Sequence, residues 1–195
     1  MAAKTRVARK RRTRERLLRA ARDLFAENGI LMTRTLDISE RARVAHGTVF
    51  LHFLTRDDLI AAAVEESAGQ AAGRIHMLAR GKLTVRQVLE THVEGLRPQE
   101  AFYARLVMEG PMLPPYARSR LIVIQSAIAV YFARAAKREM ASGKLRRMPV
   151  GLLFNTWLGL LHHYICNRDL FSPGEAVLAA RGAALVEHYL ALIKS

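Results

Sequence analysis

The sequence predicts an all-α protein. Apolar residues recur at intervals of three and four along most of the chain, and no stretch alternates as a strand would. Glycine and proline residues separate these helical stretches. An apolar fraction of 51% in 195 residues is enough for a buried core in one or two domains. We therefore expect about nine helices and no sheet.

The most informative stretch runs from Leu36 to Phe53. Two short amphipathic segments meet there at a tight bend, and Val49 and Phe53 share one face of the second segment. The first segment and the connection carry the other apolar residues: Leu36, Ile38, Ala42 and Val44. This pattern is typical of a helix-turn-helix, whose second helix lies in the major groove of DNA.

Helices are also predicted on both sides of this stretch. The preceding one should run from about Arg11 to Asn28, and Asn28-Gly29 should end it as a C-cap. The following one should begin at the capping box formed by residues 55–58 and extend to about Gln70.

Residues 14–60 resemble the DNA-binding domain of the TetR family of bacterial repressors. The residues that match are Ala20-Ala21, Leu24-Phe25, Gly29, Thr33, Asp37-Ile38, Ala42, Val44, Gly47-Thr48-Val49-Phe50, His52-Phe53 and Arg56-Asp57-Asp58-Leu59. The resemblance implies a three-helix DNA-binding domain followed by a helical ligand-binding and dimerisation domain. We expect a basic arm over residues 1–10, the helix-turn-helix domain over 11–54, and the effector and dimerisation domain over 55–195.

The charge distribution agrees with a nucleic-acid partner. The formal net charge is +14, and residues 1–22 hold ten Lys or Arg against Glu15 alone. Such a concentration favours a polyanion, either nucleic acid or an anionic membrane surface. A solvated, disordered tail is the simpler alternative. Next to a helix-turn-helix, double-stranded DNA is the expected partner, and the flexible arm should reach phosphates or a minor groove.

The predicted DNA contacts combine phosphate-binding and base-reading residues. His46 and Thr48 should read bases, while His52 and Arg56 should hold phosphates. The full set is Lys10, Arg11, Arg12, Arg14, Thr33, Arg34, Thr35, Arg43, His46, Gly47, Thr48, Phe50, Leu51, His52 and Arg56.

Four positions depart from the family pattern. One of them is Phe50, which stands where the family usually has Tyr, so a phosphate hydrogen bond should be lost. Arg34 replaces a capping Thr or Ser, so Asp37 should lack its partner, and Thr33 or Thr35 should cap the helix instead. Arg43 stands where the turn usually has Gly. Ala45 replaces the usual cap of the recognition helix, at an expected cost of about 1 kcal/mol.

The C-terminal part should form five helices, over residues 84–96, 99–109, 115–141, 150–167 and 173–194. The last two are apolar on more than one side, which favours burial against a second copy, with a monomeric core as the alternative. The resemblance implies a two-fold four-helix bundle, and hence a palindromic operator. Candidate interface residues are Leu153, Leu160, Leu161, Tyr164, Leu178, Leu185, Tyr189 and Leu192.

The resemblance also implies a pocket for a small apolar or amphipathic effector that releases the DNA. Its candidate lining is Phe102, Tyr103, Leu106, Met108, Met112, Tyr116, Ile124, Gln125, Ile128 and Trp157. Plain core packing is the alternative for each of these residues.

Other function classes find little support in the sequence. The histidines show no His-x-x-x-His spacing, and no Gly-x-Ser-x-Gly or phosphate-binding glycine loop is present, so no catalysis, metal or cofactor is expected. Cys166 is the single cysteine, which suits a reducing cytoplasm. The apolar runs are interrupted before the ~20 residues of a membrane span. We expect a homodimeric, ligand-responsive repressor. The alternatives are a non-specific architectural DNA-binding protein and a membrane-surface binder.

Overall fold

The computed structural model describes residues 2–78 and 82–195. The regular secondary structure within these residues consists of helices and one isolated β-bridge between Leu145 and Lys194. Nine helices in this described part have five residues or more, which confirms the all-α prediction. They are α1 (Ala2–Asn28), α2 (Thr35–Arg41), α3 (His46–Phe50), α4 (Arg56–Leu78), α5 (Val85–Leu96), α6 (Glu100–Glu109), α7 (Pro115–Ala141), α8 (Val150–Cys166) and α10 (Val177–Ile193).

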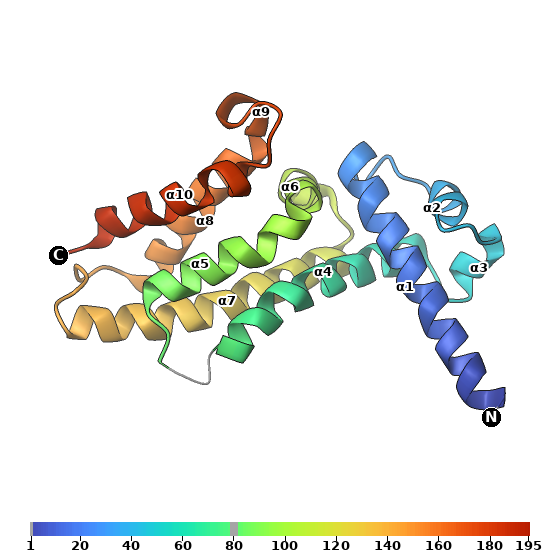
Figure 1. The fold of residues 1–195 in the computed structure, drawn as a ribbon, viewed down its shortest axis with the longest axis horizontal. Coiled ribbons are helices and arrows are strands. Elements are labelled where there is room, and N and C mark those ends of the chain that lie inside the picture. The colour runs from blue at the N-terminus through green and yellow to red at the C-terminus, as the bar shows by residue number, and fades with distance from the viewer. Residues whose placement is uncertain (1, 79–81) are drawn as a thin grey trace.

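Helices α1, α2 and α3 form a small head at one end of the molecule (Figure 1). The head has its own apolar centre, because each helix turns one face inward. Its fully buried side chains include Leu17, Phe25, Ile38 and Val49. Gly29 has a positive φ of 91° and its N–H bonds to the carbonyl of Phe25 at 3.0 Å, so the predicted C-cap of the first helix is present.

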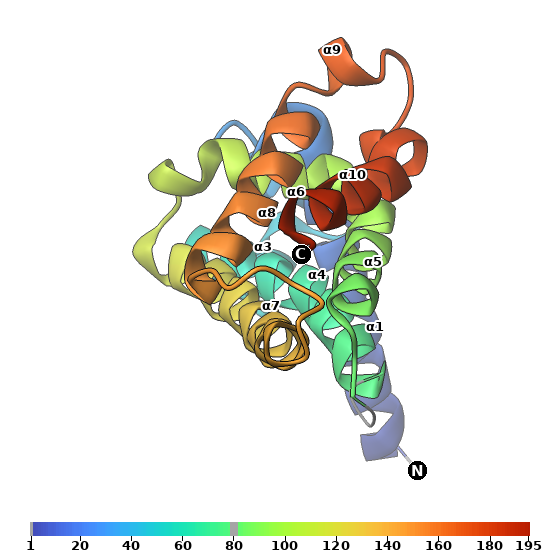
Figure 2. The same ribbon diagram turned by 90° about the vertical axis from the view of Figure 1, so that its left-hand side faces the viewer.

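The remaining helices form the body. Helix α4 leaves the head and packs beside α7 and α5, and α8 and α10 lie over the other side of α5 and α7 (Figures 1 and 2). Trp157, Tyr189 and Phe132 are fully buried where α8, α10 and α7 meet. This aromatic cluster forms the centre of the body's core.

Several helix boundaries differ from those predicted. The first helix begins at Ala2 rather than near Arg11, so residues 2–10 are helical rather than an irregular arm. Helix α4 continues past Gln70 to Leu78. The stretch expected as one helix over 173–194 contains α10, which is preceded by the single-turn helix α9 (Arg168–Phe171).

The caps of two helices can be compared with expectation. Thr84 caps α5 together with Gln87, where a helix start was predicted. At α2 neither Thr33 nor Thr35 is the cap, contrary to expectation, because Arg34 occupies the N-cap position. Asp37 lacks a Thr or Ser hydroxyl as its partner, as expected, but its carboxylate accepts the backbone N–H of Arg34 at 3.0 Å and also binds the Arg34 guanidinium.

Helix α7 is long and apolar enough to cross a membrane by length and composition alone, contrary to the expectation from its interrupted apolar run. This is weak evidence, because core helices of water-soluble proteins meet the same criteria. In the structure α7 packs against α4, α5 and α8.

Candidate DNA-binding interface

Helix α3 is held in place by its buried face. Val49 and Phe53 are buried in the head, and the opposite face exposes His46, Gly47 and Phe50. Leu51, directly after the helix, is 76% exposed. The exposed face therefore carries the residues that were expected to meet the bases.

The turn before α3 is fixed by a side chain from the first helix. Arg43 has a φ of 53°, so it occupies the left-handed conformation in which the family usually has Gly. The Arg16 guanidinium on α1 donates to the carbonyls of Ala42 and Arg43, the second at 3.1 Å. These bonds satisfy the carbonyls of the turn and hold a conformation that is strained for arginine.

His46 has two neighbours that orient its ring. Its Nε2 lies 3.0 Å from the Thr35 hydroxyl, and its ring packs edge-on against Phe50 with centroids 5.3 Å apart. Thr35 thus positions His46, and its hydroxyl does not cap α2. A Cβ built on Gly47 would meet nothing within 4 Å, which leaves room for a partner to approach the backbone.

A basic groove separates the N-terminal half of α1 from α3 and the turn. Its volume is about 840 Å³. It is lined by Arg6, Arg9, Lys10, Arg12, Thr13, Arg16, Arg43, Val44, Ala45, Thr48, Leu51 and His52. The groove places a wall of cations opposite the recognition helix, which is an arrangement suited to a sugar-phosphate strand.

The helical N-terminus is what creates this wall. Arg6, Arg9, Thr13 and Arg16 recur at intervals of three or four, so they share one face of α1. None of these four residues was among the predicted contacts. Their helical spacing was present in the sequence, but the expectation of an irregular arm over residues 1–10 separated Arg6 and Arg9 from the helix.

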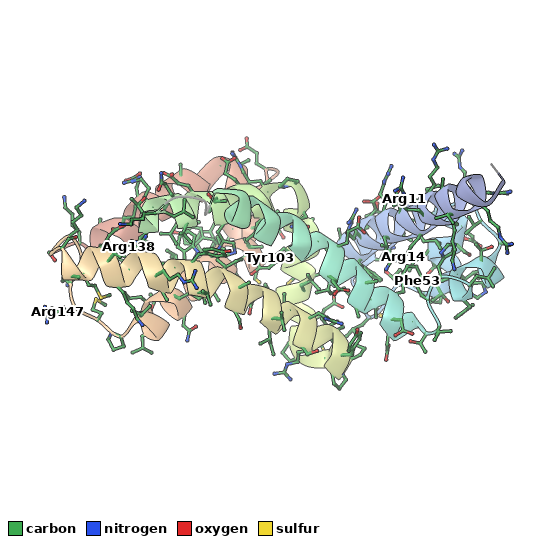
Figure 3. The ribbon with its side chains drawn as sticks, turned by 90° about the horizontal axis from the view of Figure 1, so that it is seen from below. Arg11, Arg14, Phe53, Tyr103, Arg138 and Arg147 are labelled. Carbon is green, nitrogen blue, oxygen red and sulfur yellow. The ribbon has the colours of Figure 1, made fainter. Side chains whose placement is uncertain are left out.

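The remaining basic residues of α1 have different roles. Arg14 lies over the Phe53 ring at 5.1 Å and so covers the edge of the head's core (Figure 3). Arg11 points away from Phe53 in the same view and pairs with Glu15 at 3.5 Å. Exposed pairs of this kind contribute little stability, so Arg11 remains free to exchange Glu15 for a phosphate.

His52 is a half-buried histidine on the wall of the groove. Its pKa lies below the usual range, chiefly because burial penalises the charged ring and then because Lys10 and Arg14 repel it. Its Nδ1 is buried without a hydrogen-bond partner in the described part of the chain. The neutral form is therefore favoured in the free protein, and a phosphate in the groove would favour protonation.

Two of the predicted phosphate contacts are engaged inside the protein. Thr33 is 2% exposed, and its hydroxyl donates to the carbonyls of Gly29 (2.7 Å) and Leu24 (3.3 Å). The Arg56 guanidinium donates to three carbonyls of the connection between α1 and α2, including that of Thr33 at 3.2 Å. The structure thus assigns both to holding the α1–α2 connection, and we do not retain them as DNA contacts.

The predicted effector residues fall into two groups. Phe102, Tyr103, Leu106, Ile128 and Trp157 are buried, and Gln125 is half-buried and hydrogen-bonded to Tyr103. Met108, Met112 and Tyr116 are exposed at the end of the body near the head, so they do not line an interior site. The side chain of Ile124 lies outside the described residues.

Polar pairs lie within this buried part of the body. Trp157 Nε1 donates to His92 Nδ1 at 3.1 Å, and the Tyr103 hydroxyl lies 2.8 Å from His162 Nε2. Complete burial lowers the pKa of His92 to about 4, and burial raises the pKa of Tyr103 to about 12. All these groups are therefore neutral near pH 7, so the interior suits apolar or neutral polar matter rather than ions.

Most of the predicted dimer residues are buried within the protomer. Leu153, Leu161, Leu178, Leu185 and Tyr189 belong to its own core, because α8 and α10 each use one apolar side against α5 and α7. Leu160 and Tyr164 are half-buried, and Leu192 is exposed. The exposed residues of α8 and α10 are mostly others, two of them charged, and they include Leu152, Asn155, Thr156, Gly159, His163, Ala180, Arg181, Ala183, Ala184, Glu187, His188 and Ala191.

The fold and the exposed recognition helix define a helix-turn-helix domain joined to a helical body. Residues 17–63 match the family model described as bacterial regulatory proteins of the tetR family. The N-terminal domain of this chain is therefore a DNA-binding domain of the TetR type.

Curated relatives match mainly over this domain. The HTH-type transcriptional repressor Rv3405c of Mycobacterium tuberculosis is 37% identical over 76 residues, which is 39% of this chain and 40% of that protein. The HTH-type transcriptional regulator UidR of Escherichia coli is 29% identical over 108 residues, or 54% of this chain and 55% of that protein. The aligned part of the chain thus spans about half or less of these relatives.

Solved structures extend the similarity of fold to the body. A TetR-family transcriptional regulator from Rhodococcus sp. covers 94% of this chain and 100% of its own, with a TM-score of 0.79 and 20% identity. FadR from Bacillus subtilis in complex with stearoyl-CoA covers 92% and 98%, with a TM-score of 0.75 and 20% identity. KstR2, the ketosteroid transcriptional regulator of Mycobacterium tuberculosis, covers 93% of this chain and 95% of its own, with a TM-score of 0.75 and 16% identity.

Proposed function

We propose that this chain is a homodimeric transcriptional repressor that acts in the bacterial cytoplasm, binds a palindromic operator, and leaves it when a small apolar or amphipathic ligand binds the body. The observation that carries the DNA-binding part is the basic groove beside α3. One wall offers cations for phosphates, and the other carries Thr48. His46 is exposed on the same recognition helix, outside the groove's lining, and is the second candidate for base edges.

The proposed dimer rests on the outer face of α8 and α10. This face is exposed, and Leu152 is 64% exposed on it. Arg181 and Glu187 are the charged residues exposed on α10, and Glu187 is paired with Arg86 of α5. Gly159 and the alanines of α10 allow another helix pair to approach closely, and a Cβ on Gly159 would meet nothing within the protomer. A second copy laid on this face would bury it around a two-fold axis.

A two-fold dimer carries two heads, so its target should contain two inverted half-sites. Recognition helices of such dimers contact successive turns of one duplex face, ~34–36 Å apart or a multiple of that distance. We expect the distance between the two α3 helices to set the half-site spacing.

The proposed effector class follows from the chemistry of the body's interior. Trp157 and Tyr103 are buried and form neutral hydrogen-bonded pairs with His92 and His162. Two proteins with the same fold are associated with largely apolar compounds. FadR was solved in complex with stearoyl-CoA, and KstR2 is described as a ketosteroid transcriptional regulator. We therefore propose a ligand with a large apolar part and few hydrogen-bonding groups.

The test is selection on random duplexes with the purified full-length chain, followed by measurement of operator and random-duplex affinities. The proposal predicts enrichment of one palindrome. His46→Ala and Thr48→Ala should then each reduce the preference for that palindrome by about 1–3 kcal/mol per lost base contact. Lys137→Ala, an exposed change on α7, is the matched control.

Other outcomes would decide between the alternatives. Equal protection of any duplex would identify a non-specific coating protein and refute the repressor. Sedimentation with anionic vesicles that DNA does not compete away would identify a membrane-surface binder. The effector is tested by adding fatty acyl-CoAs, steroids and related compounds to the operator complex, and release by none of them would refute the proposed ligand class.

A further inference from the structure

Helix α6 connects two parts of the molecule that are far apart in sequence. Its ten residues span ~15 Å, and it contacts α1 of the head at one end and approaches the start of α10 at the other. At both ends, charged side chains of α6 bind backbone groups rather than other side chains. Such bonds fix whole helices, because the backbone cannot rotate away as an exposed side chain can.

The first end binds the helix proposed to form the dimer. The Glu100 carboxylate, which is 6% exposed, accepts the N–H groups of Val177 (2.7 Å) and Leu178 (2.8 Å). These are the first residues of α10, where N–H groups lack acceptors within the helix. A negative charge there is also favoured by the helix dipole, so Glu100 acts as the N-terminal cap of α10.

The second end binds the head. The Arg105 guanidinium donates to the carbonyls of Ala26 (3.4 Å) and Glu27 (3.3 Å) at the end of α1. The Glu109 carboxylate, which is 9% exposed, accepts the N–H of Leu31 at 2.8 Å. A positive charge at a helix C-terminus is favourable, and the Arg105 bonds satisfy carbonyls of the last turn of α1, whereas the Glu109 bond holds the connection that follows it.

Gly29 is part of the same contact. A Cβ at this position would lie 2.9 Å from Glu109 Oε1, closer than real Cβ contacts. Directly beside these bonds, the rings of Phe25 on α1 and Phe102 on α6 stack with centroids 5.9 Å apart. The head therefore rests on α6 by a close-fitting apolar and polar contact.

We propose that Arg105 and Glu109 are positioning residues that fix the angle of the head on the body, and so determine the half-site spacing that the dimer accepts. This inference rests on the proposed dimeric repressor. Helix α4 also joins head and body, with Arg22 of α1 paired to Glu66 at 3.1 Å, but a single helix of 23 residues can bend. The second attachment at α6 removes that freedom.

The experiment measures affinity for operators in which the two half-sites are moved apart or together by single base pairs. In the wild type, affinity should fall at least tenfold for a change of one base pair. Glu109→Ala and Arg105→Ala should reduce that penalty several-fold. Both should leave the discrimination between correct and base-substituted half-sites unchanged.

Controls separate positioning from general stability or charge. Glu109→Gln keeps an oxygen for the Leu31 N–H and should retain most of the spacing preference. Glu94→Ala removes an exposed carboxylate of α5, paired with Arg97 at 3.5 Å, and should leave the preference as in the wild type. His46→Ala should do the opposite of Glu109→Ala, losing base discrimination and keeping the spacing preference.

A thermal measurement tests the contact without DNA. Gly29→Ala should lower Tm both because its φ of 91° is strained for alanine and because its Cβ meets Glu109. Adding Glu109→Ala should lower Tm by less than the sum of the two single losses, because the clash disappears while the backbone strain remains. Additive losses would show that Glu109 does not press on Gly29 and would overturn this part of the contact. A wild type without a spacing preference would refute the proposed dimeric repressor and this inference with it. A wild-type preference that Glu109→Ala retains would overturn the inference alone.

Discussion

Replacing three cations of the helical N-terminus should weaken DNA binding in a manner that depends on salt. The triple variant Arg6→Gln, Arg9→Gln and Lys10→Gln removes three side chains that line the groove opposite α3. Glutamine is a good helix former, so the change should leave α1 helical.

The size of the effect follows from counterion release. Three phosphate contacts in each protomer give six in the proposed dimer, and each contributes ~0.9 to the slope of log K against log salt concentration. The slope should therefore fall by about 5. Between about 50 and 200 mM salt, the affinity of the variant should then drop roughly a thousandfold less than that of the wild type.

The assay is fluorescence anisotropy with a labelled operator and with a random duplex over this salt range. Both slopes should fall equally, because phosphate contacts carry no sequence information. The matched control is Arg134→Gln, Lys137→Gln and Arg147→Gln, which removes the same charge from exposed positions of α7 and the loop after it. Figure 3 places Arg147 at the opposite end of the molecule from Arg11. An unchanged slope in the first variant, or equal changes in both, would refute the groove as the phosphate site.

Three further predictions concern stability and assembly. Arg43→Gly should raise the free energy of unfolding by up to ~1 kcal/mol in urea titrations, because glycine adopts the positive φ without strain; a less stable variant would contradict this. Gly159→Leu should give a monomer at micromolar concentration by analytical ultracentrifugation, while Gly69→Leu, another exposed helical glycine with open space, should not; a dimeric Gly159 variant would exclude this face. The pKa of His92 is about 4 when folded and near 6.5 when unfolded, so the unfolded chain binds more protons between these values, and stability is lost as the pH is lowered through this range. The unfolding free energy should be about 2 kcal/mol lower at pH 5 than at pH 7.5, and His92→Phe should remove most of that loss; equal pH dependence in both proteins would refute the assignment.

Local patterns in the sequence determined the elements of this fold. The spacing of Val49 and Phe53 identified the buried face of the recognition helix, and Thr84 identified the start of α5. The turn at Arg43 could be predicted to need a left-handed residue because of its place in the family motif. These features depend on residues within a few positions of one another, so they are visible in a single sequence.

The tertiary structure decided which faces and polar groups remain available. Leu153 and Leu161 are buried in the protomer while Leu152 is exposed, although all three lie on one strongly apolar helix. Thr33 and Arg56 looked suited to phosphates, but carbonyls at the end of α1 and in its connection to α2 engage them. The roles of Glu100, Arg105 and Glu109 were likewise unforeseen, because their partners lie 77 or more positions away in the chain. Periodicity specifies that a face is buried, whereas only the packing of distant helices specifies what covers it and which polar groups it pairs.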